Sequence, residues 1–196
     1  GDFFNVGRTT VSYSAMDAAG NGVTSSFTVT VTDGQAPTIN GLPADISVSN
    51  DPGQCAAAVT WTEPSATDNC AVTSFSSDET NGASYPVGTT TVTYTATDIH
   101  GNSSTASFDV IVEDDEAPAI GTPAADETVE CDGSGNTAAL MAWLSNNAGA
   151  AATDNCSAVT WSNDFTTMAN TCGGAGAVQV IFTATDEAGN MSTTTA

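Results

Sequence analysis

The sequence predicts an all-β protein built of repeated sandwich units, and three observations support this. A strand-like stretch ending in Asp-x-x-Gly-Asn occurs three times. Within each copy, apolar and polar residues alternate, which is the period of a half-buried strand. Two further landmarks, Ala-Pro and Ala-Thr-Asp-Asn-Cys, recur in the same order along the chain. Internal repeats of this length indicate an array of similar modules.

The landmarks divide the 196 residues into three repeats. Asp98 follows Asp17 by 81 residues and precedes Asp186 by 88. Residues 1–33 are predicted to be the C-terminal part of a first repeat, residues 34–114 a complete repeat, and residues 115–196 a divergent, longer repeat that lacks its last strand. We interpret the chain as an excerpt of a longer array; alternatively, each copy lends an edge strand to its neighbour in a fibre.

The recurring stretch predicts a β-hairpin in each repeat. In the second repeat, Val92, Tyr94 and Ala96 alternate with threonines and form the inward face of the first strand. The Gly-Asn turn that follows suits a glycine with positive φ. The corresponding inward residues elsewhere are Val11, Tyr13 and Ala15, then Val180, Phe182 and Ala184, and those of the second strands are Phe27, Val29 and Val31, then Phe108, Val110 and Val112.

Shorter strands are predicted upstream of each hairpin. In the second repeat they contain Ile46 and Val48, then Val59 and Trp61, then the stretch around Phe75. Several short strands with turn signals in about 80 residues indicate an immunoglobulin-like β-sandwich. One segment differs: residues 136–145 have high helix propensity and a candidate N-cap in Asn136, so we predict a short helix in the third repeat, with a bulged strand as the alternative.

Charge and composition exclude several classes of function. One basic residue, Arg8, stands against 23 acidic ones, and a net charge of -22 repels the phosphates of nucleic acids. The apolar runs are too short to insert into a membrane. A nucleophilic triad would need a histidine, and the only one, His100, occupies a hairpin loop where the other repeats carry Ala19 and Ala188. We therefore expect a protein that is not an enzyme.

The acidic residues recur at loops that an immunoglobulin-like connectivity brings to one end of each module. These loops are the incoming linker, the segment after the Trp61 strand and the hairpin turn. Converging carboxylates repel one another unless a cation lies between them, and Ca²⁺ accepts six to eight oxygens in irregular geometry. The alternative is that these aspartates only cap turns. The predicted metal ligands are Asp17, Asp33, Asp68, Asp98, Asp114, Asp115, Asp154 and Asp186.

The second repeat resembles the hyalin repeat (HYR) modules of extracellular proteins, including bacterial tandem arrays. The resemblance is carried by Ala36-Pro37, by Ala66-Thr-Asp-Asn-Cys70, by Tyr85-Pro-Val-Gly-Thr-Thr90 and by Asp98 with Gly101-Asn102. It extends through residues 1–33 and, more loosely, through the third repeat. The resemblance implies an immunoglobulin-like fold, secretion, and roles in adhesion or matrix assembly, and it implies no catalytic activity.

Five cysteines without a CxxC pair favour disulfides, and hence an oxidising compartment. Family members often carry a further cysteine pair at the positions of Leu42 and Ala106, so the resemblance leaves Cys55 and Cys70 as partners in the second repeat.

The third repeat holds three cysteines, so one is left over. Cys131 with Cys156 and Cys131 with Cys172 are both compatible with the pattern. The odd thiol could bond to another chain.

Two functions fit these patterns. The first is a structural filament or stalk on the cell surface, with neighbouring repeats or copies of itself as partners. The second is an adhesin or carbohydrate-binding module array, attached to a cell surface or to a secreted enzyme, with surface glycans as partners. A glycan site needs exposed aromatic side chains, whereas Trp61 is predicted to face inward, which favours the stalk.

Overall fold

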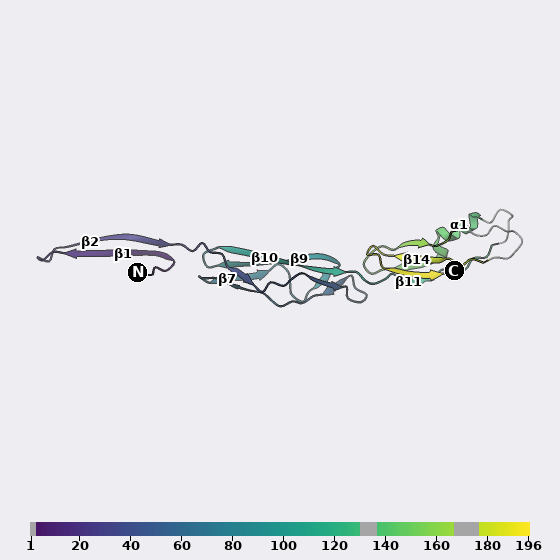
Figure 1. Ribbon diagram of the computed structural model, residues 1–196, viewed down its shortest axis with the longest axis horizontal. Coiled ribbons are helices and arrows are strands. Elements are labelled where there is room, and N and C mark those ends of the chain that lie inside the picture. Colours follow the sequence, from purple (N-terminus) through teal and green to yellow (C-terminus); the bar gives the residue numbers. More distant parts are fainter. Residues whose placement is uncertain (1–2, 130–136, 167–176) are drawn as a thin grey trace. The chain divides into compact units, whose positions relative to one another are not determined.

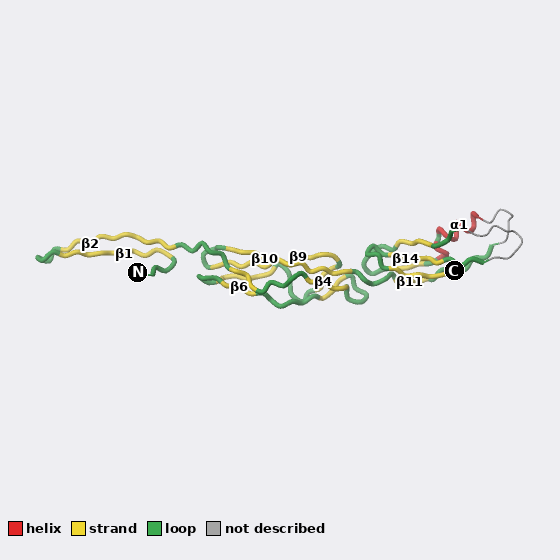
Figure 2. The backbone as a smooth tube through the Cα atoms, viewed as in Figure 1, coloured by secondary structure: helices red, strands yellow, loops and turns green. Residues whose placement is uncertain are grey.

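A computed structural model describes residues 3–129, 137–166 and 177–196, and nearly all its regular structure is β-strand (Figure 1, Figure 2). The predicted all-β fold with immunoglobulin-like sandwich repeats is confirmed. The chain forms two compact units whose boundary cuts across the second repeat. Unit 1 comprises Gly1–Ala44, Thr62–Thr80 and Val92–Phe108, and unit 2 comprises Asp45–Trp61, Asn81–Thr91 and Asp109–Ala196.

The first repeat contributes a long hairpin to unit 1. Strands β1 (Gly7–Met16) and β2 (Gly22–Val31) pair antiparallel along their whole length. The face predicted to be inward is largely open, because Tyr13 is 54% exposed and Phe27 47%. Their rings contact each other, with centroids 5.7 Å apart. The described residues place no second sheet over this face, so the alternating pattern formed the strands without burying them.

The second repeat is a sandwich whose strands belong to three sheets. The principal sheet has the order β4-β10-β9-β7, with β4 and β10 parallel, and the pairs β3-β6 and β5-β8 complete the repeat. The strands are β3 (Thr38–Asn40), β4 (Ile46–Ser49), β5 (Ala56–Ala58), β6 (Ser65–Thr67), β7 (Val72–Ser77), β8 (Ser84–Pro86), β9 (Gly88–Asp98) and β10 (Ser103–Glu113).

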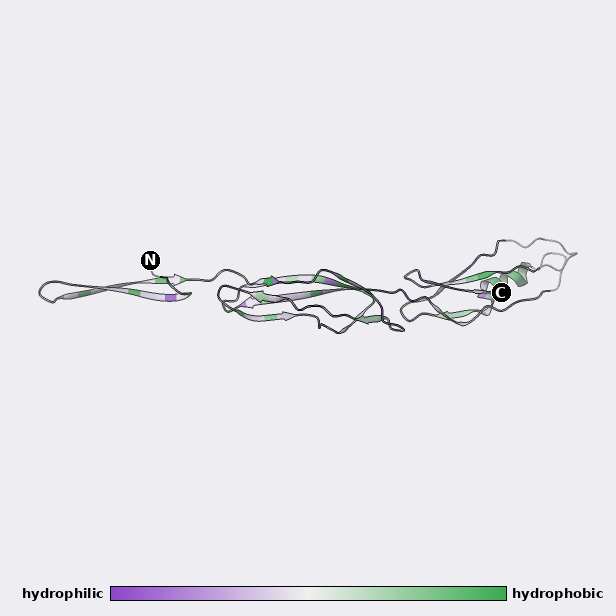
Figure 3. Ribbon diagram, turned by 60° about the horizontal axis from the view of Figure 1, so that its bottom comes forward, coloured by the Kyte–Doolittle hydropathy of each residue, from purple (hydrophilic) through white to green (hydrophobic). Residues whose placement is uncertain are grey.

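The predicted inward residues of β9 and β10 form the core of this repeat. Val92 and Ala96 are fully buried and Tyr94 nearly so, and Phe108, Val110 and Val112 are buried on β10. Figure 3 shows the resulting alternation of hydrophobic and hydrophilic residues along the strands. The strand predicted at Val59 and Trp61 ends earlier, at Ala58. The backbone of Trp61 does not pair with another strand because the Asn81 side chain binds both of its polar groups. Asn81 Oδ1 accepts from Trp61 N at 3.0 Å, and Asn81 Nδ2 donates to Trp61 O at 2.8 Å.

The third repeat belongs to unit 2 and forms a two-stranded and a three-stranded sheet. The pairs are β11-β12 and β13-β14-β15. The prediction that this repeat lacks its last strand is wrong, because the residues after the turn at Asn190 continue antiparallel to β14. The elements are β11 (Ala119–Thr122), α1 (Thr137–Ser145), the 3-10 helix η1 (Asn147–Gly149), β12 (Ala151–Thr153), β13 (Thr160–Asn163), β14 (Ile181–Thr185) and β15 (Met191–Thr195).

The predicted helix is α1, and it covers the core of the third repeat. Its candidate cap, Asn136, lies outside the described residues. Leu144 is buried against Val180 and Phe182. Trp143 meets the Phe182 ring edge-on at 5.3 Å and donates from Nε1 to the Ala125 carbonyl at 2.9 Å, so the helix is fixed by both apolar and polar contacts. Within the described ranges, no helix is long and apolar enough to cross a membrane.

Removing the Phe182 side chain should lower the free energy of unfolding of the third repeat by about 3–5 kcal/mol, because Phe182 is fully buried and truncation leaves a cavity. Tyr13→Ala changes the matching position of the exposed first hairpin and should lower the free energy of unfolding by no more than about 0.5 kcal/mol. Denaturation followed by the fluorescence of Trp143 and Trp161, which pack against this core, measures the stability of the third repeat in both variants. Equal losses in Phe182→Ala and Tyr13→Ala would contradict the assignment of the core.

Candidate functional site

Each Asp-x-x-Gly-Asn turn wraps its backbone around the aspartate carboxylate. In the second repeat, Asp98 Oδ1 accepts from His100 N and Asn102 N, both at 2.8 Å, and Oδ2 accepts from Asn102 Nδ2 at 2.7 Å. This turn requires one residue with a left-handed backbone conformation, and Gly101 adopts it with φ +90°. Gly20 and Gly189 adopt nearly the same φ, which confirms the predicted role of the turn glycine.

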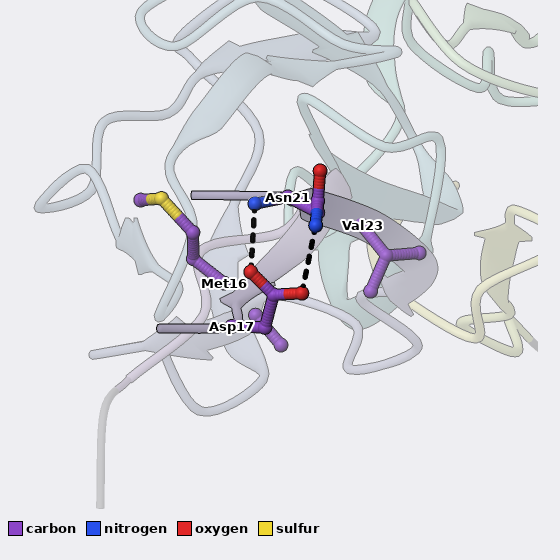
Figure 4. Close-up of a pocket in the computed structure, with 6 residues that line it drawn as sticks. Met16, Asp17, Asn21 and Val23 are labelled. Carbon is purple, nitrogen blue, oxygen red and sulfur yellow. Dashed lines mark hydrogen bonds between the residues drawn. The ribbon is translucent and has the colours of Figure 1, made fainter. Parts of the chain in front are cut away.

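The first hairpin shows this turn in isolation. Asp17 accepts from Ala19 N, Asn21 N and Asn21 Nδ2, each at 2.9 Å, and a shallow exposed pocket between Met16 and Val23 opens beside it (Figure 4). In the described part of the chain, no further acid, cysteine or histidine joins Asp17 in a candidate metal cluster. Asp17 is predicted as a metal ligand, and in the structure its carboxylate accepts hydrogen bonds from its own turn.

A first acidic cluster, formed by Asp33, Asp68 and Asp98, lies in unit 1. Each residue offers a carboxylate oxygen, and these oxygens lie within 4.8 Å of one another. The three residues come from the linker, from the loop after β6 and from the end of β9, which are the three segments predicted to converge. The Asp33 side chain is only 3% exposed and Asp98 only 2%, so the carboxylates are largely removed from water.

Hydrogen bonds keep the most buried member of this cluster ionised. Burial raises the pKa of Asp98, but the donors Asn102 and His100 outweigh burial, and the pKa of Asp98 lies below its ordinary value. Asn102 also ties the turn to the linker, because its Nδ2 donates to the Asp33 carbonyl at 3.4 Å. The cluster therefore holds negative charge at neutral pH.

Cys70 and His100 also border the first acidic cluster; the sequence predicts Cys70 as a disulfide partner, and it predicts neither residue as a metal ligand. Together with Asp33 they form a second candidate ligand set. His100 Nδ1 lies 3.2 Å from Asp33 Oδ2, and burial followed by Asp33 raises the pKa of the Cys70 thiol. From the sequence, His100 is expected only to occupy a hairpin loop. The signal for Cys70 was the Asp-Asn-Cys motif itself, in which the cysteine lies two residues from Asp68 and its N–H donates to Asp68 Oδ1 at 2.8 Å.

A second acidic cluster, formed by Asp114 and Asp154 with the Cys156 thiol, lies at the equivalent place in unit 2. Asp154 Oδ1 accepts from Cys156 N at 2.8 Å and from Ser157 N at 2.9 Å. Asp154 Oδ2 is buried and has no hydrogen-bond partner among the described residues. A buried carboxylate oxygen without a donor is costly, so this atom needs a proton or a cation.

Asp186 holds the hairpin turn beside the second acidic cluster. Its carboxylate accepts from Gly189 N at 2.6 Å, Asn190 N at 2.8 Å and Asn190 Nδ2 at 2.9 Å, and Asn190 Nδ2 reaches the Asp114 carbonyl at 3.0 Å. Burial raises the pKa of Asp186, but the donors of the turn outweigh it and the pKa is lowered. Burial, followed by repulsion from Asp154 and Asp186, raises the pKa of Asp114.

Asp115 was predicted as a metal ligand, and the structure places it elsewhere. Its carboxylate accepts a hydrogen bond from Ser49 Oγ at 2.6 Å, on an exposed surface. Asp114 lies in the second acidic cluster, whereas Asp115 pairs with Ser49, so the structure separates these two neighbouring acids. Asp115 therefore serves as an acidic neighbour outside the candidate site.

Cys55, Cys70 and Cys156 are all free thiols in the structure, so the predicted Cys55–Cys70 disulfide stays a prediction. Cys55 belongs to unit 2 and precedes β5, whereas Cys70 belongs to unit 1 and lies beside Asp33. The loops thus give the two cysteines different neighbours. Cys131 and Cys172 lie outside the described residues, so the predicted pairings of Cys131 remain predictions.

The donor atoms of both clusters suit a hard divalent cation. Carboxylate oxygens dominate in both clusters, and Ca²⁺ is bound by oxygen ligands of this kind. The unpartnered Asp154 Oδ2 fits a bound cation at the second cluster. The thiols of Cys70 and Cys156 are softer donors, and they would favour a softer metal where they remain free.

Comparison with known proteins gives a family context for the first and second repeats. The family model described as "HYR domain" matches residues 1–31 and 32–112, more than half of the chain. Hyalin of Strongylocentrotus purpuratus is 40% identical over 129 residues, covering 63% of this chain and 11% of hyalin. Hyalin of Lytechinus variegatus is 36% identical over 129 residues, covering 61% of this chain and 23% of hyalin.

A more distant relative is "Sushi, von Willebrand factor type A, EGF and pentraxin domain-containing protein 1" of Rattus norvegicus, 30% identical over 115 residues, covering 56% of this chain and 3% of that protein. These relatives are eukaryotic, so the bacterial-type array remains a prediction. The chain spans less than a quarter of each relative's length.

Replacing Asn102 by Ala should raise the pKa of Asp98, because two of its donors belong to Asn102 and the side-chain one is lost. With a folded pKa below its ordinary value, ionised Asp98 stabilises the fold above about pH 4, and this contribution disappears as the pH falls through the folded pKa. In Asn102→Ala the folded pKa of Asp98 is closer to its ordinary value, so the stabilisation by ionised Asp98 should be smaller and should be lost at a higher pH than in the unchanged protein.

NMR titration of the Asp98 carboxyl carbon measures this shift. Asn21→Ala, which removes the matching amide of the first hairpin, should leave the pKa of Asp98 unchanged. An unaltered Asp98 titration in Asn102→Ala would show that the Asn102 amide does not control this carboxylate.

Proposed function

This chain belongs to the HYR domain family, and we propose that it is a non-catalytic extracellular segment of a filament or stalk whose modules are stiffened by Ca²⁺. The observation that carries the proposal is the repetition of one acidic arrangement at equivalent positions of two modules. Each arrangement joins an acid of the linker to an acid of the Asp-Asn-Cys loop, next to a hairpin aspartate.

Calcium would act by removing the repulsion within these clusters. Three carboxylates lie close together in the first acidic cluster, and a net charge of -22 leaves few other cations to neutralise them. A cation held by Asp33 or Asp114 of the linker and by loop acids of the following module would fix the linker to that module. Bound at about 100 times its dissociation constant, a ligand adds roughly 2.7 kcal/mol of stability.

That contribution is large for a small domain, whose total stability is about 5–15 kcal/mol. Extracellular calcium modules bind with dissociation constants of about 10⁻⁴–10⁻³ M, so stiffening would follow the calcium concentration outside the cell. The extracellular location is supported by membership in the HYR family and by the similarity to the two hyalins. The same relatives support a structural or adhesive role and no catalytic one.

The positions of the tryptophans favour a stalk over a glycan-binding array. Trp143 and Trp161 pack against the core of the third repeat. Trp61 contacts the ring of Tyr85 at 6.1 Å and is half-buried. A carbohydrate platform needs aromatic faces open to solvent, and these three rings are partly covered by their own modules. The adhesin or carbohydrate-binding array stays as the second candidate function.

Chelation of calcium should lower the melting temperature, and saturating Ca²⁺ should raise it, with a stabilisation of about 2–3 kcal/mol per site. Asp98→Asn and Asp154→Asn remove one ligand charge from each cluster and should weaken calcium binding at least tenfold, as measured by calorimetry. Asp115→Asn is the matched control, since it removes one charge from the same linker outside the cluster. A melting curve insensitive to chelator, or equal weakening in all three variants, would reject the calcium proposal.

Negative-stain microscopy of the native material separates the two candidate functions. Regular filaments whose order is lost in chelator would support the calcium-stiffened stalk. Isolated particles that bind immobilised glycans would instead support the adhesin.

A further inference from the structure

We propose that Cys55 and Cys156 form a disulfide that joins the second repeat to the third. Both cysteines are half-buried and belong to unit 2. The bond would be a covalent crosslink between successive modules, unlike the pairing within one module that the sequence suggested. It goes beyond the calcium proposal, because it needs no bound ion.

The loop that carries Cys55 is held rigidly by the second repeat. Asn50 N donates to the Glu113 carbonyl at 2.9 Å, and Asn50 Nδ2 donates to the Gln54 carbonyl at 2.8 Å. The Cys55 carbonyl accepts from Val87 N at 3.2 Å. The Cys55 backbone therefore has a fixed position at this end of the module.

Glu116 brings the Cys156 loop onto this loop. Its carboxylate accepts from Gly53 N at 2.9 Å on one side and from Asn155 Nδ2 at 2.9 Å on the other. Asn50 Nδ2 also lies 3.3 Å from Glu116 Oε2. One carboxylate thus joins the loop before Cys55 to the residue before Cys156.

The Cys156 sulfur lies on the Cys55 loop as a result. It is 4.0 Å from the Gln54 carbonyl oxygen and 4.0 Å from Asn50 Nδ2, and Gln54 is the residue adjacent to Cys55. Burial, followed by a hydrogen bond with the Cys55 side chain and the charge of Asp114, raises the pKa of Cys156 to about 12. The contacts with Gln54 and Asn50 therefore place the Cys156 sulfur beside the segment that carries Cys55.

Cys70 shows that the Asp-Asn-Cys motif alone does not produce this arrangement. Its thiol interacts with the Asp33 carboxylate, and the described residues place no second cysteine in its surroundings. Cys70 is therefore a matched control with the same local sequence and a different neighbour.

The oxidation requires an external disulfide as the electron acceptor, such as oxidised glutathione or a disulfide-carrier protein. The Cys55 and Cys156 thiols lose two protons and two electrons, and one S–S bond forms between them. The acceptor disulfide is cleaved and takes up the same protons and electrons as two thiols.

Peptide mapping of the full chain, secreted into an oxidising compartment and alkylated before digestion, tests the proposal. Trypsin is unsuitable because Arg8 is the only basic cleavage residue. An endoproteinase that cleaves before aspartate places every cysteine on its own peptide: residues 51–67, 68–77, 126–131, 154–163 and 164–185. We expect peptides 51–67 and 154–163 to be linked before reduction and separate after it.

The same map should be obtained when calcium is chelated, so loss of the calcium effect and loss of the crosslink are distinguishable. Cys70→Ser should keep the linked peptide, whereas Cys55→Ser should abolish it and leave Cys156 alkylated. Linkage of Cys55 to Cys70, linkage of Cys156 to Cys131, or alkylation of both Cys55 and Cys156 in the native chain would overturn the proposal.

Discussion

The carboxylate of the hairpin aspartate is the constraint on which the rest of the structure depends. In the second and third repeats it collects the N–H groups of its own turn and the amide of an asparagine four residues later. The same asparagine then reaches the backbone of the incoming linker, at Asp33 or Asp114. One buried anion therefore fixes the hairpin turn, the linker and the start of the next strand together. Because burial alone would favour the neutral acid, the hydrogen bonds of the turn are what keep this charge in place.

The buried hairpin aspartate lies close to other acidic side chains in the second and third repeats. The linker and the Asp-Asn-Cys loop each bring another carboxylate to the same end of the module, so the turn collects like charges. In the second acidic cluster, burial and then repulsion from Asp154 and Asp186 raise the pKa of Asp114, and one Asp154 oxygen has no donor among the described residues. Either protons or a cation can relieve it. The two clusters differ in their cysteines, since Cys70 lies with Asp33 and His100, whereas the Cys156 sulfur lies against the Gln54 carbonyl.

The prediction of the fold followed from a local property, the alternation of apolar residues, and it was accurate where burial and alternation agree. Val92, Tyr94 and Ala96, and likewise Val180, Phe182 and Ala184, are buried as expected. The same alternation in the first hairpin gave strands with Tyr13 and Phe27 largely exposed, because the period of the pattern shows which residues share a face and not whether another sheet covers that face.

The helix over Thr137–Ser145 was predictable from helix propensity. The strand at Trp61 was shortened by a single long-range partner, Asn81, which no local pattern indicates.

By itself, the sequence determined the repeats, most of the strands, the turn glycines and the loops that carry the acids, because each of these depends on neighbours within a few residues or on a motif that recurs. Only the tertiary structure decided which acid leaves the cluster and which thiols meet. Asp114 and Asp115 are adjacent and chemically identical, yet the first lies in the second acidic cluster and the second pairs with Ser49. Cys70 and Cys156 share the same motif, yet their neighbours come from loops far away in the chain. Spacing along the chain carries no information about such neighbours, because the packing of separate loops sets them.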